Sequence, residues 1–169
     1  MEIDLKLIKR KQAVEHIVFS MISHYRSCKR MLTLVVNSGV YDTAVTMLKN
    51  KLENLKVDDA SNKNADIVRV NKEYWRGIDA YVKAAERYGK ISRLGVQNEP
   101  MNPIVNELYD DALSQDGITN VLRRENMFAY INVIKGDEKV AVETTGLMGL
   151  HLPKKKILEF SIFFQRIVK

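Results

Sequence analysis

The chain has 169 residues and a formal net charge of +6, from 27 basic and 21 acidic side chains. Its hydrophobic content of 46% is too high for a disordered chain, and its charged content of 28% is too high for a membrane protein. The longest apolar run, ILEFSIFF at 157–164, is about half of a membrane span, so we expect no membrane partner. One cysteine cannot form an internal disulfide, which favours a reducing, cytoplasmic location. The length predicts a single domain over 1–169.

Helical spacing of apolar residues dominates the first third of the chain. Residues at intervals of three and four predict two helices, or one with a break, between Leu5 and Val36, and Ser23 is a candidate N-cap for the second. Asn37-Ser38-Gly39 ends this region, and a further amphipathic helix is expected over 40–55. Residues 57–66 are polar and lack periodicity, so they predict an exposed loop.

The middle of the chain continues the helical pattern. Apolar residues from Asp66 to about Ser92 predict another helix, and Pro103 is well placed to open the next, which would end near Gly117. Residues 118–150 are an insertion that the pattern does not settle: 118–134 fits a helix, whereas 128–145 alternates like a short β-hairpin around Gly136-Asp137. We favour the hairpin, and expect Pro153 to open a closing helix. The expected fold class is therefore mainly α, a helical bundle with one short hairpin. Its predicted core residues are Ile17, Met21, Leu32, Val35, Leu48, Leu52, Tyr81, Leu108 and Phe164.

No constellation of residues indicates catalysis or metal binding. The paired acids are adjacent in sequence and point apart on a helix, and the three histidines are scattered, so we expect neither catalytic nor metal-ligating residues. Cys28 occupies an apolar helical phase, where inert packing is the usual role. No phosphate-binding glycine loop or hydrolase motif occurs. The sequence therefore predicts a protein that is not an enzyme and has no cofactor.

Basic residues concentrate near the two ends of the chain. Residues 1–56 hold 10 basic and 5 acidic side chains and residues 151–169 hold 5 and 1, whereas residues 101–150 hold 4 and 8. Such a distribution suits a protein that holds a polyanion on one surface. The candidate RNA-binding residues, which would contact phosphates and sugars, are Lys6, Arg10, Arg26, Lys29, Arg30, Lys49, Lys51, Lys154, Lys155 and Lys156.

Three segments resemble one known family. They are IKRKQAVEHIVFSMI, then YRSCKRMLTLVVNSGVYDTAVTMLKNK, and LPKKKILEFSIFFQRIV at the end. In this order they resemble the small helical subunit of type III-B CRISPR RNA-targeting (Cmr) complexes. Residues 118–150 match nothing in that subunit.

The resemblance implies a non-catalytic subunit of an antiviral ribonucleoprotein. It would stack with copies of itself along the duplex of guide RNA and target RNA, next to the backbone and large subunits, and stabilise the duplex through basic surface. Two alternatives remain at this point. One is a helical regulator of phage or plasmid origin that binds nucleic acid or protein, and the other is an unrecognised enzyme.

Overall fold

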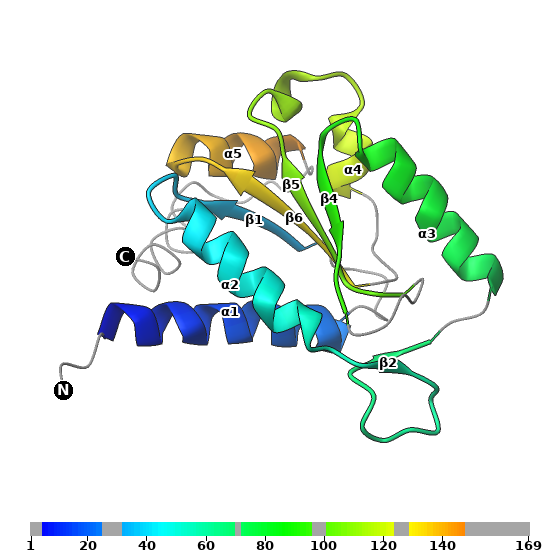
Figure 1. Cartoon of the computed structure of the whole chain (residues 1–169). Helices are drawn as coiled ribbons and strands as arrows, with labels where there is room; N and C mark the ends of the chain where they lie inside the picture. The colour runs from blue at the N-terminus through cyan, green and yellow to red at the C-terminus, as the bar shows by residue number, and fades with distance from the viewer. Residues whose placement is uncertain (1–4, 25–31, 70–71, 96–100, 124–128, 148–169) are drawn as a thin grey trace.

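The structure is a computed structural model that describes residues 5–24, 32–69, 72–95, 101–123 and 129–147. Helices and strands alternate through this part of the chain (Figure 1). In chain order the elements are α1 (Leu5–His24), β1 (Leu32–Val36), α2 (Tyr41–Glu53), β2 (Val57–Asp58), β3 (Ile67–Val68), α3 (Lys72–Ala85), β4 (Gly89–Arg93), β5 (Ile104–Leu108), the 3-10 turn η1 (Ala112–Ser114), α4 (Ile118–Arg123), β6 (Tyr130–Lys135) and α5 (Glu138–Leu147).

Four strands form one mixed sheet in the order β1-β6-β5-β4. Strands β1, β6 and β5 run parallel, with Leu34 beside Val133, and β4 runs antiparallel to β5. Strands β5 and β6 lie inside the sheet, and nine of their eleven residues are buried. Parallel strands that are covered on both faces carry near-continuous apolar runs, and IVNEL and YINVIK fit that description apart from Asn106, Glu107, Asn132 and Lys135.

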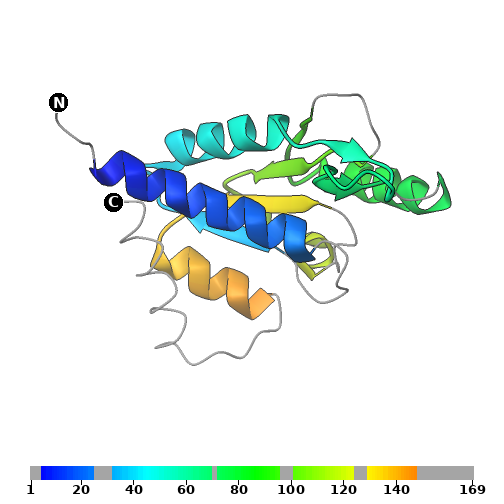
Figure 2. The same ribbon diagram turned by 90° about the horizontal axis from the view of Figure 1, so that it is seen from below.

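Helices cover both faces of this sheet. Figure 2 shows α2 and α5 on opposite sides of it, with α1 running alongside β1. Glu107 of β5 forms an ion pair with Lys49 of α2, so the face that carries Glu107, Leu34 and Val133 is called here the α2 face. Side chains alternate along a strand, so Asn106 and Asn132 point to the opposite side, called here the α5 face. Helix α3 also packs on the α5 face, where Tyr81 contacts Tyr130.

The structure contradicts the prediction of a mainly α helical bundle. Strand β1 replaces the second of the expected early helices, and β5 with η1 replaces the helix expected after Pro103. The helix expected over about 66–92 is instead β3, α3 and β4. Strands β1 (LTLVV) and β5 (IVNEL) are five-residue runs rich in apolar side chains, and over this length helical periodicity cannot be told from a buried strand. The fold is α/β.

Other expectations are confirmed or half right. Helices α1 and α2 lie where amphipathic helices were expected, and predicted core residues such as Met21, Leu48 and Tyr81 are buried. The expected hairpin is half wrong: β6 is a strand, but Gly136-Asp137 leads into α5 instead of a second strand. The reason is local, because the Asp137 carboxylate accepts hydrogen bonds from the backbone N–H groups of Lys139 and Val140 and so caps a helix. The closing helix expected after Pro153 lies outside the described residues.

Candidate functional site

The carboxyl ends of β1 and β6 form a topological switch point. The two strands are parallel neighbours, yet the helix that follows β1 covers one face and the helix that follows β6 covers the other (Figure 2). The two outgoing connections therefore diverge, held together at their start by a backbone hydrogen bond of 3.0 Å from Gly136 N–H to the Val36 carbonyl. In open α/β sheets, ligands bind in the crevice outside the strand ends at such a point.

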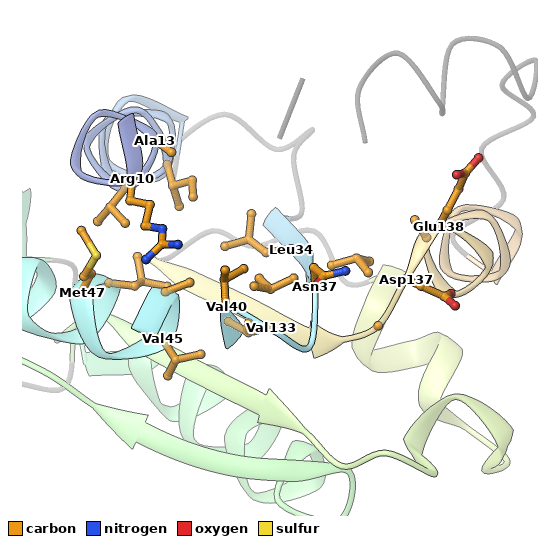
Figure 3. Close-up of a pocket in the computed structure, with 18 residues that line it drawn as sticks. Arg10, Ala13, Leu34, Asn37, Val40, Val45, Met47, Val133, Asp137 and Glu138 are labelled. Carbon is orange, nitrogen blue, oxygen red and sulfur yellow. The ribbon is translucent and has the colours of Figure 1, made fainter. Parts of the chain in front are cut away.

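A cavity of about 90 Å³ opens beside this switch point, between α1, α2 and the α2 face of the sheet (Figure 3). Apolar side chains supply most of its wall. Polar groups stand at its two ends, with Arg10 of α1 at one end and Asn37 and Asp137 at the other. The lining residues are Arg10, Ala13, Val14, Ile17, Leu34, Val35, Val36, Asn37, Val40, Ala44, Val45, Met47, Leu48, Val133, Gly136, Asp137, Glu138 and Ala141.

Of the two helices that leave the switch point, α5 is capped by a side chain and α2 is not. Asn37 Oδ1 accepts the Gly39 N–H at 3.0 Å, just before α2. Asp137 Oδ1 accepts the N–H groups of Lys139 and Val140 at 2.9 and 3.2 Å, at the start of α5. A dinucleotide needs free backbone N–H groups and no negative charge where its diphosphate sits. The Asp137 carboxylate therefore places a negative charge at the start of α5, where it competes with a phosphate for the backbone N–H groups.

A polar cluster lies near the cavity, where α2 begins and β5 ends. Lys49 and Glu107 pair with side chains that are 22% and 19% exposed. Burial and the nearby Glu107, Asp42 and Asp110 carboxylates raise the pKa of Tyr41 to about 12. Lys135 Nζ lies 5.8 Å from the centre of the Tyr41 ring. This cluster keeps Tyr41 protonated and gives the ends of the strands fixed charges.

The chemistry of the cavity is that of binding. Its lining contains no thiol and no histidine, and its two carboxylates, Asp137 and Glu138, are adjacent in sequence at the start of α5. Among the described residues, no group of three or more His, Cys, Asp or Glu side chains is arranged to hold a metal ion. No described helix has the length and apolar content needed to cross a membrane.

The structure describes four of the ten predicted RNA-binding residues. Lys6 lies in α1, Arg10 of the same helix lines the cavity, Lys49 is paired with Glu107, and Lys51 Nζ is 3.8 Å from Glu15 Oε1 on exposed surface. The other six, outside the described residues, are Arg26, Lys29, Arg30, Lys154, Lys155 and Lys156. These positions do not test whether any of the ten residues contacts phosphate.

Sequence reasoning missed the polar residues in the centre of the sheet. Asn106 and Asn132 have no exposed surface and lie side by side on β5 and β6, where Asn106 Nδ2 donates to Asn132 Oδ1 at 3.1 Å. A signal was present, because an asparagine in the middle of an apolar run such as YINVIK is unusual for a buried strand. This signal did not lead to a prediction of paired asparagines, because 104–108 was predicted to be part of a helix.

Comparison with known proteins finds relatives by structure and not by sequence. No protein-family model matches the chain, and no curated protein matches it. Proline utilization A from Bradyrhizobium japonicum matches 83% of this chain with a TM-score of 0.66 at 17% identity. An NAD-dependent benzaldehyde dehydrogenase from Corynebacterium glutamicum matches 83% with a TM-score of 0.63 at 16% identity. The 1-pyrroline-5-carboxylate dehydrogenase of Thermus thermophilus matches 80% with a TM-score of 0.62 at 20% identity.

These matches show the fold that the chain shares and how much of each protein it spans. The chain covers 14% of the proline utilization A chain, 29% of the benzaldehyde dehydrogenase and 26% of the 1-pyrroline-5-carboxylate dehydrogenase. It therefore shares its α/β fold with a part of each of these three proteins.

The comparisons correct several expectations from the sequence. The resemblance to a Cmr subunit is wrong, because the structural neighbours are dehydrogenases and the fold is not a helical bundle. For the same reason, the predicted roles as a CRISPR effector subunit or as a helical regulator are wrong. The predicted partners, which were guide RNA, target RNA and other CRISPR subunits, are wrong as well. The conclusion that the chain is not an enzyme is also wrong, since its fold is one that dehydrogenases use. The resemblance rested on helical spacing in segments that include β1.

Proposed function

We propose that this chain takes part in the oxidation of an aldehyde, as the part of an aldehyde-dehydrogenase-like protein that engages the carbonyl group. One observation carries the proposal: 80–83% of the chain superposes on dehydrogenases named for benzaldehyde and 1-pyrroline-5-carboxylate. Fold alone does not define a reaction, so the proposal also needs a residue that could perform the chemistry.

Cys28 is the best candidate for that residue. A thiolate is the strongest nucleophile among the side chains of this sequence, and its addition to an aldehyde forms a C–S bond and leaves a tetrahedral carbon that still carries its hydrogen. A nicotinamide dinucleotide, the coenzyme in the name of the benzaldehyde dehydrogenase, would accept this hydrogen as a hydride with its electron pair. The thioester that remains would be hydrolysed by water to the carboxylic acid and the free thiol. Cys28 is the single cysteine of the chain and stands between α1 and β1, outside the described residues. The earlier expectation that it packs inertly is untested.

The cavity at the switch point and Cys28 lie at opposite ends of β1. The cavity lies at the carboxyl end of β1, whereas Cys28 precedes the amino end of the same strand. No part of the described structure is assigned to the hydride acceptor. The testable claim is therefore the reaction of Cys28 with carbonyl compounds.

The experiment uses the purified full chain and needs no cofactor. Cleavage of p-nitrophenyl acetate measures attack of a nucleophile on a carbonyl, and it is followed as release of nitrophenolate. We expect cleavage that Cys28→Ser lowers at least tenfold and that benzaldehyde inhibits in competition with the ester. Thr145→Val, a change on α5, is the matched control and should leave the rate unchanged. Equal rates in wild type and Cys28→Ser, or no inhibition by aldehyde, would contradict the proposal.

A further inference from the structure

Three polar side chains form a row across the parallel strands on the α5 face. Thr33 of β1 is in register with Asn132 of β6, and Asn132 is in register with Asn106 of β5. Residues in register on neighbouring strands point to the same side of the sheet, so the three side chains follow one another across it. This row is called here the Thr33–Asn132–Asn106 row.

Every member of the row has a buried atom without a hydrogen-bond partner in the part of the chain that the structure describes. Asn106 Nδ2 donates to Asn132 Oδ1 at 3.1 Å, which satisfies the middle of the row. The unpartnered atoms are Thr33 Oγ1, Asn132 Nδ2 and Asn106 Oδ1. A buried polar group without a partner costs about 1–3 kcal/mol, and native structures contain few of them. Three in one row therefore indicate a missing hydrogen-bonding molecule.

The Thr33 end of the row has the chemistry and the spacing for a water molecule. Asn132 Nδ2 is a donor and Thr33 Oγ1 is both a donor and an acceptor, so one water can bond to both. Neighbouring strands lie about 4.8 Å apart, and two hydrogen bonds of about 2.8 Å that meet at a water oxygen span a similar distance. A direct bond between these atoms is absent from the described structure.

The opposite end of the row has less room. Asn106 Oδ1 lies 2.2 Å from the place where a Cβ atom on Gly89 would be, so glycine at this position leaves the space that the amide occupies. We therefore place the water at the Thr33 end.

We propose that the sheet holds an ordered internal water molecule between β1 and β6, hydrogen-bonded to Thr33 Oγ1 and Asn132 Nδ2. The water extends the Asn106–Asn132 amide bond to a third strand. It thereby ties β1, whose one pairing partner in the described sheet is β6, to the polar centre of the fold. This proposal is independent of the reaction assigned to Cys28.

Magnetic relaxation dispersion of water nuclei tests the proposal, because it counts water molecules that stay inside a protein for longer than nanoseconds. Thr33→Val keeps the shape of the side chain and removes the hydroxyl, so we expect it to lower the count by one. Thr33→Ser keeps the hydroxyl and should keep the count. Thr145→Val is the control, since the Thr145 hydroxyl already donates to the Ala141 carbonyl at 2.7 Å.

A crystal structure of the full chain supplies the position of the water. We expect electron density within hydrogen-bond distance of Thr33 Oγ1 and Asn132 Nδ2 in the wild type, and none there in Thr33→Val. An unchanged count in Thr33→Val together with empty density at this place would overturn the proposal. A water found only against Asn106 Oδ1 would overturn it as well.

Discussion

The two faces of the sheet are buried by opposite chemistry. The α2 face is lined by aliphatic side chains such as Leu34 and Val133 and leaves a cavity beneath α1 and α2. The α5 face carries buried aromatic and amide side chains, including Tyr130, Asn106 and Asn132. Packing on the α2 face is apolar and incomplete, whereas on the α5 face each polar atom requires a partner. Added volume should therefore be tolerated on the first face and rejected on the second.

The largest effect is expected where the α5 face is filled by a ring. Tyr130 is 1% exposed, and its ring meets that of Tyr81 edge to face with 5.1 Å between centroids. Tyr130→Ala should lower the free energy of unfolding by about 3–5 kcal/mol, measured by urea denaturation, because it leaves a large cavity. Tyr130→Phe keeps the ring and should cost much less. A loss below about 1 kcal/mol in Tyr130→Ala would show that this face is not closely packed.

Adding a single methyl group separates a crowded position from an open one. A Cβ atom at Gly89 would lie 2.2 Å from Asn106 Oδ1 and 2.6 Å from the Glu107 carbonyl oxygen, so Gly89→Ala should destabilise the fold by about 1–3 kcal/mol. A Cβ atom added at Gly77 of α3 would have no neighbouring side chain or packed element within 4 Å. Gly77→Ala should therefore stabilise the protein by about 0.4–1 kcal/mol in the same denaturation experiment. Equal effects of the two changes would contradict the crowding at Gly89.

One substitution made on both sides of the sheet tests the comparison itself. Val45 lines the cavity on the α2 face, so Val45→Leu should fill space there and stabilise by up to about 0.8 kcal/mol. Val121 of α4 is buried beside Tyr81, whose hydroxyl donates to the Val121 carbonyl at 2.7 Å. Val121→Leu should overpack this region and cost about 1–3 kcal/mol. If both variants changed the free energy of unfolding in the same direction, the proposed difference in packing between the two faces would be contradicted.

A further effect is expected at high pH and comes from Tyr41. Its pKa is raised to about 12 in the folded protein, whereas an unfolded tyrosine loses its proton near 10. The unfolded state therefore binds fewer protons between these values, and the stability that is present below pH 10 should decline as the pH rises toward 12. Denaturation curves of wild type and Tyr41→Phe should show a smaller decline in the variant. The same decline in both would assign the effect to another group.

The sequence was a good guide where helices are long and amphipathic, and a poor one where apolar runs are short. Helix α2 was found because thirteen residues give more than three turns of pattern, and Leu48 and Leu52 were correctly placed in the core. Strands β1 and β5 have five residues each, and in such runs an apolar face of a helix and a strand buried on both faces look alike. Only pairing between residues about 100 positions apart, as in Leu34 beside Val133, distinguishes them.

The candidate sites were beyond the sequence for a similar reason. The cavity combines Arg10 of α1, Val45 of α2 and Asp137 before α5, and these residues come together only through the sheet between them. The Thr33–Asn132–Asn106 row likewise depends on the register of three strands. Arg10 was singled out for its charge, but its place on the wall of an apolar cavity follows from the packing of α1 on α2.

The central claim is the parallel sheet itself, and nuclear Overhauser effects measured by NMR on the isotope-labelled full chain test it most directly. The α/β fold predicts contacts between the backbones of Leu34 and Val133, and between the side-chain amides of Asn106 and Asn132. It also predicts extended-strand coupling constants over 130–135. Sequential amide contacts typical of a helix over 32–36 and 104–108, without any contact between these segments and 130–135, would contradict it.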